Sequence, residues 1–337
     1  MFKNKVFIIA IESSCDETSV SVISDGVIIS NVIVTQFLHK NYGGVIPEIA
    51  SMNHQKNMIF IIKKAISDAN IDIFKLSAIG FTQGPGLLGS LLIGVSFAKA
   101  LSFSLKLPLI SIDHIKAHVL SNFIDYPKPT FPFLCLIVSG GHTKLVLVED
   151  YLNFKTIGET RDDAIGESFD KIANLINIPY PGGSIVDLYS NNGFLKFLFP
   201  ISNLSNLNFS FSGIKTSFLY FLKYNKIKDK NFIKTNRSNI CFSIQYHLIS
   251  ILVKKLKYSI FKTNIFNISL SGGVAANSNL RSELFNISIK NNWNFFIPDF
   301  KYCTDNAAMI AISSYYQYLV DDFSDLNAKV IPKLFFN

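Results

Sequence analysis

The chain has 337 residues, enough for two domains with a hydrophobic core each. Hydrophobic residues make up 49% of it and the mean hydropathy is +0.30, yet no apolar run reaches the roughly 18–20 residues that span a bilayer. Four scattered cysteines without a CxxC pair argue against a disulfide framework or a zinc knuckle. The start lacks the shape of a signal peptide, so we expect a cytoplasmic protein with no membrane partner.

The net charge is +8, and 29 of the 32 basic residues are lysine. A nucleic-acid partner fits this charge. A general compositional drift explains it about as well, because Lys, Asn, Ile and Phe are all plentiful in the chain.

The chain opens with a predicted buried strand at residues 6–11, with hairpin neighbours at 20–23 and 27–29. Between them lies a polar turn that carries Asp16 and Glu17. Such a turn is either an ordinary solvated loop or a site. We favour a site, because the same layout recurs later in the chain.

Two glycine-rich turns follow in the first half, at residues 42–48 and 83–90, each leading into a predicted helix (49–67 and 91–103). In the second turn, a strand, a glycine loop and a helix together form an anion-binding geometry, since free backbone N–H groups point outward. The turn matches neither Walker A nor GxGxxG, and tight packing of the helix on the sheet is the alternative.

Two histidines, His114 and His118, are four residues apart on a predicted helix that follows a strand at 108–112. Residues at this spacing share one helix face, so both imidazoles can reach one transition metal. Two ligands are too few, and Asp305, in a polar break before an apolar helix, is the best distant candidate for a third. The alternative is that both histidines simply line a helix surface.

A strand–turn–strand layout then repeats. Residues 133–138 predict a buried strand, Ser139-Gly140-Gly141-His142-Thr143 a turn, and 144–149 the return strand. This matches residues 6–23 and suggests duplicated domains. Here two glycines replace the carboxylates, and exposed N–H groups next to glycine can hold phosphate oxygens.

The remaining elements are helices, glycine turns and short strands. We predict helices at 162–176, 239–261 and 303–320, strands at 267–270 and 295–298, and glycine turns that enter helices at 179–187, 209–216 and 271–277. His247 and His39 are interpreted as structural.

Eight motifs, in order over nearly the whole chain, resemble the TsaD family, the bacterial tRNA threonylcarbamoyladenosine transferases. They lie at residues 11–18, 42–48, 84–87, 114–118, 138–143, 209–213, 271–277 and 303–306. The resemblance implies an α/β, actin-like (ASKHA) fold with two duplicated RNase H-like domains around a central cleft. The N-terminal domain would span residues 1–130, completed by about 305–337, and the C-terminal domain 131–304.

The resemblance also implies a reaction. A threonylcarbamoyl group moves from threonylcarbamoyl-AMP to N6 of adenosine 37 in tRNAs that read codons starting with A. The family's metal ligands fall on His114, His118 and Asp305. One divalent ion per subunit is implied, Fe²⁺ first and Zn²⁺ second.

The family's substrate-binding positions fall on nine residues, Ile137, Val138, Ser139, Gly140, Gly141, Asp170, Gly183, Asp187 and Asn277. Asp16 and Glu17 are the candidates for catalytic acid, base or orienting work. Partners implied are tRNA, a TsaB-like paralogue and a TsaE-like ATPase, with the donor supplied by a TsaC/Sua5-like synthase.

Two departures from the family pattern stand out. Asp113 replaces a histidine that often precedes the first ligand, and the tail at residues 330–334 has fewer charges than usual and no Trp.

Three rival interpretations remain. A metalloprotease would need HExxH, but Ile115 follows His114. An actin-like ATPase or sugar kinase has no need for two imidazoles, and a non-catalytic scaffold would not need so complete a set of site residues.

Overall fold

Strand β1 (Phe7–Glu12) lies at the centre of the first of two five-stranded sheets in the computed structural model, which describes residues 5–201, 204 and 206–334. β1 pairs antiparallel with β2 (Glu17–Ser24), and β2 with β3 (Val27–Thr35). On its other side β1 pairs parallel with β4 (Ala78–Gly84), and β4 with β5 (Leu109–Asp113). The predicted hairpin is present, and its second and third strands are longer than expected.

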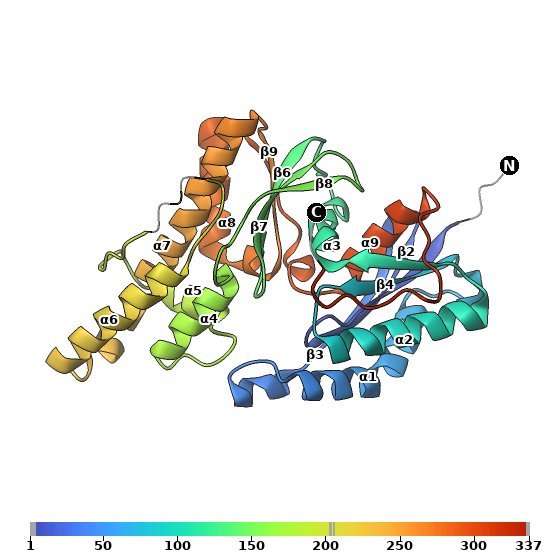
Figure 1. Cartoon of the computed structure of the whole chain (residues 1–337), viewed down its shortest axis with the longest axis horizontal. Helices are drawn as coiled ribbons and strands as arrows, with labels where there is room; N and C mark the ends of the chain where they lie inside the picture. Colours follow the sequence, from blue (N-terminus) through green and yellow to red (C-terminus); the bar gives the residue numbers. More distant parts are fainter. Residues whose placement is uncertain (1–4, 202–203, 205, 335–337) are drawn as a thin grey trace. The chain divides into compact units, whose positions relative to one another are not determined.

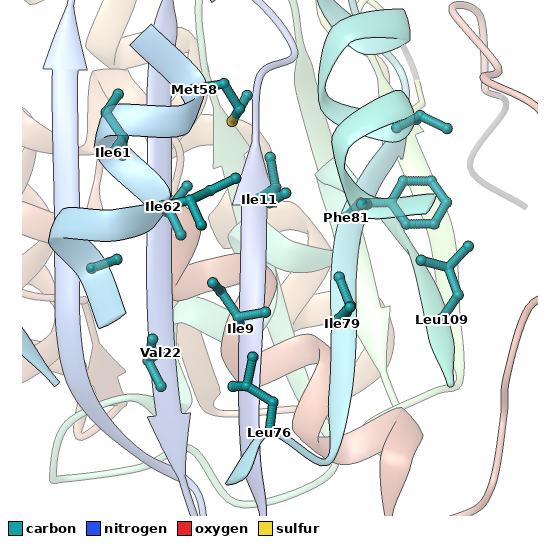
Figure 2. Packing of buried hydrophobic residues seen from close by; sticks show 14 residues of the cluster. Ile9, Ile11, Val22, Met58, Ile61, Ile62, Leu76, Ile79, Phe81 and Leu109 are labelled. Carbon is teal, nitrogen blue, oxygen red and sulfur yellow. The ribbon is translucent and has the colours of Figure 1, made fainter. Parts of the chain in front are cut away.

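Helices cover both faces of this sheet. α1 (Pro47–Asp68) and α2 (Leu88–Leu105) bury a cluster of aliphatic side chains and Phe81 against β1, β2, β4 and β5 (Figure 2). α9 (Ala307–Tyr318) packs on β1, β2 and β4. A Cβ on Gly80 of β4 would collide with the Ser314 side chain of α9, so this glycine lets the helix lie close to the sheet.

Helix α2 meets the length and composition of a membrane span, contrary to the expectation that no apolar run is long enough. It has 18 residues with a mean hydropathy of 1.6. Such a composition also suits a core helix, and α2 packs against α1 and β4. Ser90, Leu91, Gly94, Val95, Ala98 and Ser102 are the residues that it buries.

The second sheet repeats the first. β6 (Phe133–Val138) pairs antiparallel with β7 (Thr143–Val148) and parallel with β9 (Asn267–Ser271). β8 (Phe154–Glu159) and β10 (Asn294–Phe296) complete the order β10-β9-β6-β7-β8, which matches β5-β4-β1-β2-β3. The predicted duplication is therefore confirmed by the topology.

Five helices belong with this second sheet (Figure 1): α4 (Ile165–Leu175), α5 (Gly182–Ser190), α6 (Ser212–Lys228), α7 (Phe232–Thr263) and α8 (Ser278–Asn291). α7 begins seven residues before its predicted start at 239, because Ile233 and Asn236 are already buried in its first turns. Strand β8 was not predicted; its residues mix exposed and buried positions without clean alternation.

The chain divides into two compact units. One comprises Met1–Lys128, Glu149–Phe154 and Pro298–Asn337, and the other Pro129–Val148 and Lys155–Ile297. The first therefore holds the first sheet, α9, and a short helix α3 (His114–Leu120).

Candidate metal centre and nucleotide-binding turns

Helix α3 is started by the residue that departs from the family pattern. The Asp113 side chain accepts hydrogen bonds from the backbone N–H groups of Ile115 (2.7 Å) and Lys116 (3.1 Å), as an N-cap does. This cap begins the helix at His114, directly after β5. One turn later, the His118 ring lies edge-on to the His114 ring, with centroids 4.7 Å apart. Both imidazoles are buried.

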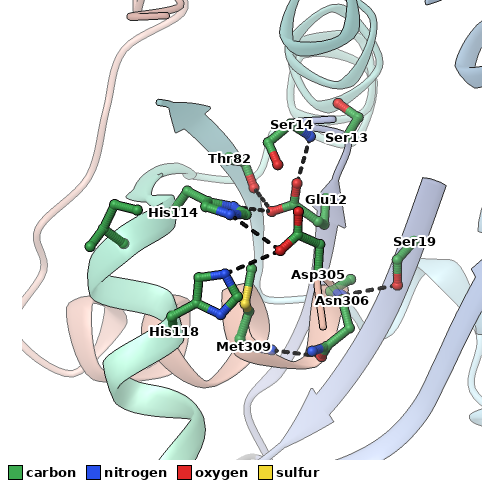
Figure 3. A network of polar contacts seen from close by, with 12 residues as sticks. Glu12, Ser13, Ser14, Ser19, Thr82, His114, His118, Asp305, Asn306 and Met309 are labelled. Carbon is green, nitrogen blue, oxygen red and sulfur yellow. Dashed lines mark hydrogen bonds and ion pairs between the residues drawn. The ribbon is translucent and has the colours of Figure 1, made fainter. Parts of the chain in front are cut away.

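Asp305 comes from the other end of the chain and meets both imidazoles (Figure 3). Its Oδ1 lies 3.1 Å from His118 Nε2 and 3.4 Å from His114 Nε2. The next residue, Asn306, caps α9 by accepting from Met309 N at 3.2 Å, and Ala307 N donates to Ser19 Oγ of β2 at 2.9 Å. These bonds fix the start of α9, and with it Asp305. One ligand atom from each of the three predicted ligands lies within 4.8 Å of the others.

Glu12, at the end of β1, supports this group from behind. Its Oε2 lies 3.0 Å from His114 Nδ1 and accepts a hydrogen bond from Thr82 Oγ1 at 2.6 Å, while Oε1 accepts from Ser14 N (Figure 3). The side chain is fully buried. A carboxylate bound to Nδ1 keeps a proton on that nitrogen, so Nε2, which faces Asp305, is the atom of His114 that would bind a metal. Sequence reasoning assigned Glu12 no role.

The electrostatics of the group favour a cation. Burial works against a charged imidazole, but Glu12 and then Asp305 raise the pKa of His114 well above its usual value. Despite burial, His114 and His118 hold the pKa of Asp305 well below its usual range. Burial, followed by the charges of Asp305 and Asp16, raises the pKa of Glu17 to about 10. Closely spaced buried carboxylates make a negative potential that a metal ion would neutralise.

The donor set also fits a transition metal. Two imidazole nitrogens and one carboxylate oxygen are the ligands that Fe²⁺ and Zn²⁺ accept, whereas Mg²⁺ and Ca²⁺ prefer oxygen alone. His118 Nδ1 is buried and has no hydrogen-bond partner in the described part of the chain. The ring of His118 is therefore oriented chiefly through its Nε2 side, toward Asp305.

The turn with the predicted catalytic residues, Asp16 and Glu17, is tightly held. The carbonyl of Cys15 lies 2.9 Å from His54 Nε2 and 3.2 Å from Ser90 Oγ, both of which can donate to it. His54 Nδ1 then accepts from Thr18 Oγ1 at 2.7 Å. His54 thus has a structural role, and burial lowers its pKa, which keeps it neutral. Both carboxylates are partly buried, and the charge of Asp305 acts on Glu17.

In the second unit, two glycine turns follow neighbouring parallel strands. β6 leads into Ser139-Gly140-Gly141, and β9 leads into a turn that begins at Gly272. A Cβ at Gly140 or Gly141 would meet no atom within 4 Å, so the backbone there faces open space. Such edges, at the carboxyl ends of parallel strands, are where α/β sheets bind ligands. Ile137 and Val138 are fully buried in β6, so only their backbone atoms are available to a ligand.

The other predicted binding residues all hold helix ends. Asp170 Oδ1 accepts from the backbone N–H groups of Gly182 (2.7 Å) and Gly183 (3.3 Å) at the start of α5. Asp187 accepts from Ser278 N at 2.9 Å, at the start of α8. Asn277 is the N-cap of α8, since its Oδ1 accepts from Leu280 N at 2.9 Å. These bonds hold the starts of α5 and α8 in place.

Gln245 of α7 connects these residues and was missed by sequence reasoning. Its amide donates to Asp187 Oδ1 (3.1 Å) and Ser190 Oγ (2.8 Å), and its Oε1 accepts from Asn277 Nδ2 (2.8 Å). The side chain is buried. The signal in the sequence is an amide within a largely apolar stretch of helix, between Ser243 and His247.

The matched sheets and the histidine–carboxylate group define an α/β protein of the actin-like (ASKHA) fold with a candidate metal centre. Two solved structures share the fold. Full-length HypF in its phosphate- and nucleotide-bound form aligns with a TM-score of 0.63 at 12% identity, covering 94% of this chain and 47% of HypF. Component A of the Acidaminococcus fermentans (R)-2-hydroxyglutaryl-CoA dehydratase aligns with a TM-score of 0.55 at 13% identity, covering 93% of this chain and 99% of component A.

Sequence relatives identify the family. The family model of tRNA N6-adenosine threonylcarbamoyltransferase, TsaD, matches residues 27–312. The enzyme of that name from Cytophaga hutchinsonii is 49% identical over 330 residues, covering 98% of this chain and 96% of the relative. That from Christiangramia forsetii is 50% identical, with 97% of each covered. The chain belongs to the tRNA N6-adenosine threonylcarbamoyltransferase family, as the motifs indicated.

Proposed function

We propose that the chain transfers a threonylcarbamoyl group from threonylcarbamoyl-AMP to N6 of adenosine 37 in tRNAs that read codons starting with A. The observation that carries this proposal is the convergence of His114, His118 and Asp305, within a chain that is about half identical to transferases of that name. The reaction forms a bond from N6 to the carbamoyl carbon, breaks the bond from that carbon to the phosphate oxygen, and releases AMP and a proton.

His114, His118 and Asp305 would hold one divalent ion, Fe²⁺ first and Zn²⁺ second. When bound, such an ion supplies Lewis-acid stabilisation of negative charge on donor oxygens. Glu12 keeps Nε2 of His114 available for this role. The preference for iron rests on the family resemblance, and the donor set fits both metals.

The protein's own groups would bind the donor and move the proton. The N–H groups of the Ser139-Gly140-Gly141 turn would bind phosphate, and the helix starts held by Asp170, Asp187 and Asn277 would position the nucleotide. N6 is a poor nucleophile, because its lone pair is delocalised into the purine. Asp16 is our candidate to take the N6 proton. Glu17 is the second candidate for acid, base or orienting work, and burial raises its pKa to about 10.

We further propose that the chain works with a TsaB-like paralogue and a TsaE-like ATPase, and that a TsaC/Sua5-like synthase makes the donor. The test is mass spectrometry of nucleosides from unmodified tRNA incubated with threonine, bicarbonate, ATP and these partners. Threonylcarbamoyladenosine should form only when the chain is present. Asp305→Asn should abolish it, and Glu283→Gln, on the exposed surface of α8, should not. Product formation without the chain would disprove the proposal.

A further inference from the structure

The positive charge of this chain is concentrated in one helical hairpin. Residues 212–263, which form α6, α7 and their connection, contain 11 of the 32 Lys and Arg residues and only one of the 24 Asp and Glu residues. The rest of the chain has 21 basic and 23 acidic residues, a net charge of −2. A uniform compositional drift would spread the excess lysine evenly, so drift does not explain this distribution.

Helix α6 buries one row of apolar residues and exposes a row of tyrosine and lysine. Ile214, Phe218 and Leu222 repeat at intervals of four and are buried. Tyr220, Tyr224 and Lys228 repeat at the same interval, offset by two residues, which places them about 200° around the helix. Both tyrosines are well exposed, at 65% and 59%. Lys228 lies over the Tyr224 ring, with its Nζ 4.1 Å from the ring centroid.

An aromatic cluster on the inner face of the hairpin holds α6 against α7. Phe221 of α6 lies 5.6 Å from Phe232 of α7 and 4.9 Å from Phe197, measured between ring centroids. Phe199 packs edge-on against Phe218 at 5.6 Å. This cluster packs α6 against α7, while Tyr220, Tyr224 and Ile227 of α6 stay exposed among the lysines.

The tip of the hairpin presents a lysine patch, formed by Lys223, Lys226, Lys228, Lys230 and Lys234, all exposed. Asp229 is the only acid in the hairpin, and its carboxylate accepts from Asn231 N at 2.8 Å. No ion pair involves these five lysines among the interactions of the described residues. Figure 1 shows α6, drawn in yellow, beside the start of α7.

We propose that the tip of the α6–α7 hairpin is a tRNA-binding surface, in which the lysine patch contacts backbone phosphates and Tyr220 and Tyr224 stack on unpaired bases. This inference rests on the proposed function for the identity of the RNA. Exposed lysines interleaved with tyrosines suit RNA, because phosphates need cations and every base offers a face for stacking. An acidic protein surface would use the lysines and leave the tyrosines without a partner.

The test compares two full-length variants with equal loss of charge. The patch variant is Lys223→Gln/Lys226→Gln/Lys228→Gln/Lys230→Gln. The control is Lys56→Gln/Lys63→Gln/Lys75→Gln/Lys290→Gln, at exposed positions elsewhere. Binding of an unmodified tRNA transcript is measured by fluorescence anisotropy over a range of salt concentrations, with circular dichroism melts to verify the fold.

Each lost phosphate contact lowers the slope of log K against log salt by about 0.7–0.9, so we expect the slope of the patch variant to fall by about 3. Its affinity should fall at least about tenfold, and the control should stay within about twofold of wild type. Tyr220→Ala/Tyr224→Ala should weaken binding by about fivefold or more and leave the slope unchanged, because stacking releases no counterions.

Three results would overturn the inference. The patch variant could keep the slope and tRNA affinity of wild type, or the control could lose as much tRNA affinity as the patch variant does. The patch variant could also lose binding to anionic phosphatidylserine vesicles and still bind tRNA as wild type does. The nucleoside assay distinguishes failure of the hairpin assignment from failure of the proposed function. If the patch variant binds tRNA normally and wild type still forms the product, only the hairpin assignment is wrong. If wild type neither binds tRNA nor forms product, both are wrong.

Discussion

Glu12 Oε2 accepts a hydrogen bond from Nδ1 of His114 across 3.0 Å, and this bond joins the end of the central strand to the candidate metal centre. The two residues are 102 positions apart in the chain. They meet because β4 lies between β1 and β5 in the sheet, and Thr82 of β4 donates to the same carboxylate oxygen. The carboxylate orients the imidazole from outside the ligand set.

Replacing Glu12 should weaken metal binding without removing a ligand. Glu12→Gln keeps the shape of the side chain but loses the charge that fixes the Nδ1 proton, and such partners typically contribute 10–100-fold to metal affinity. We expect a loss in that range for Zn²⁺ and Fe²⁺, measured by competition with a chromophoric chelator under anaerobic conditions. Glu283→Gln, at an exposed position of α8, is the control. Equal affinities for Glu12→Gln and wild type would contradict the orienting role.

Metal binding should release protons. The pKa of His114 is raised above its usual value of 6.5, so the metal-free imidazole carries a proton that must leave before Nε2 can bind a cation. Apparent affinity should therefore rise with pH, through a window that lies above pH 6.5. Calorimetry in buffers of different ionisation enthalpy should count at least one proton released per ion at pH 7. If metal binding took up protons, or exchanged none, His114 would not be protonated in the metal-free protein, and the prediction would be wrong.

Two glycines in the second unit should respond differently to alanine. A Cβ at Gly166 would lie 2.6 Å from Ser139 O, whereas one at Gly140 meets no atom within 4 Å. Gly166→Ala should lower the free energy of unfolding by about 1–3 kcal/mol, the usual cost of overpacking. Gly140→Ala should leave unfolding within about 0.5 kcal/mol of wild type, yet weaken AMP binding by blocking close approach.

Urea denaturation and equilibrium dialysis with AMP measure these two effects. If Gly140→Ala binds AMP as well as wild type does, the turn does not contact the nucleotide.

Gln245 should stabilise the second unit and the proposed nucleotide site together. Gln245→Leu removes three hydrogen bonds and leaves Asp187, Ser190 and Asn277 each without one partner. Buried polar groups that lose a partner cost about 1–3 kcal/mol, so the urea midpoint should fall markedly. AMP affinity should fall too, since Gln245 no longer joins the end of α5 to the start of α8. Gln317→Leu, at a surface bond to Asp322, is the matched control.

His54 should matter for the turn that carries Asp16 and Glu17. His54→Ala leaves Cys15 O and Thr18 Oγ1 without their imidazole partner, and should lower the free energy of unfolding by about 1–3 kcal/mol. It should also lower single-turnover transfer, because the turn loses an anchor. His54→Gln, which can both donate and accept, should recover part of each loss. No recovery by glutamine would mean that packing, rather than hydrogen bonding, is what His54 supplies.

The sequence by itself determined the features that depend on near neighbours. Apolar runs predicted β1, β6 and β9. A polar segment after β1 and glycine-rich segments after β6 and β9 predicted the turns, and a four-residue spacing placed His114 and His118 on one face. The repeated strand–turn–strand layout indicated duplication, which the two strand orders confirm.

The tertiary structure alone decided which distant residues meet. Sheet order brought Glu12 to His114, and the packing of α7 on α5 brought Gln245 to Asp187 and Asn277. It also showed that Asp170, Asp187 and Asn277 hold helix ends, and that the surplus charge of the chain lies on one hairpin. Periodicity constrains only residues within one helix or strand. Contacts between elements depend on how their buried faces pack, and that is a property of the whole fold.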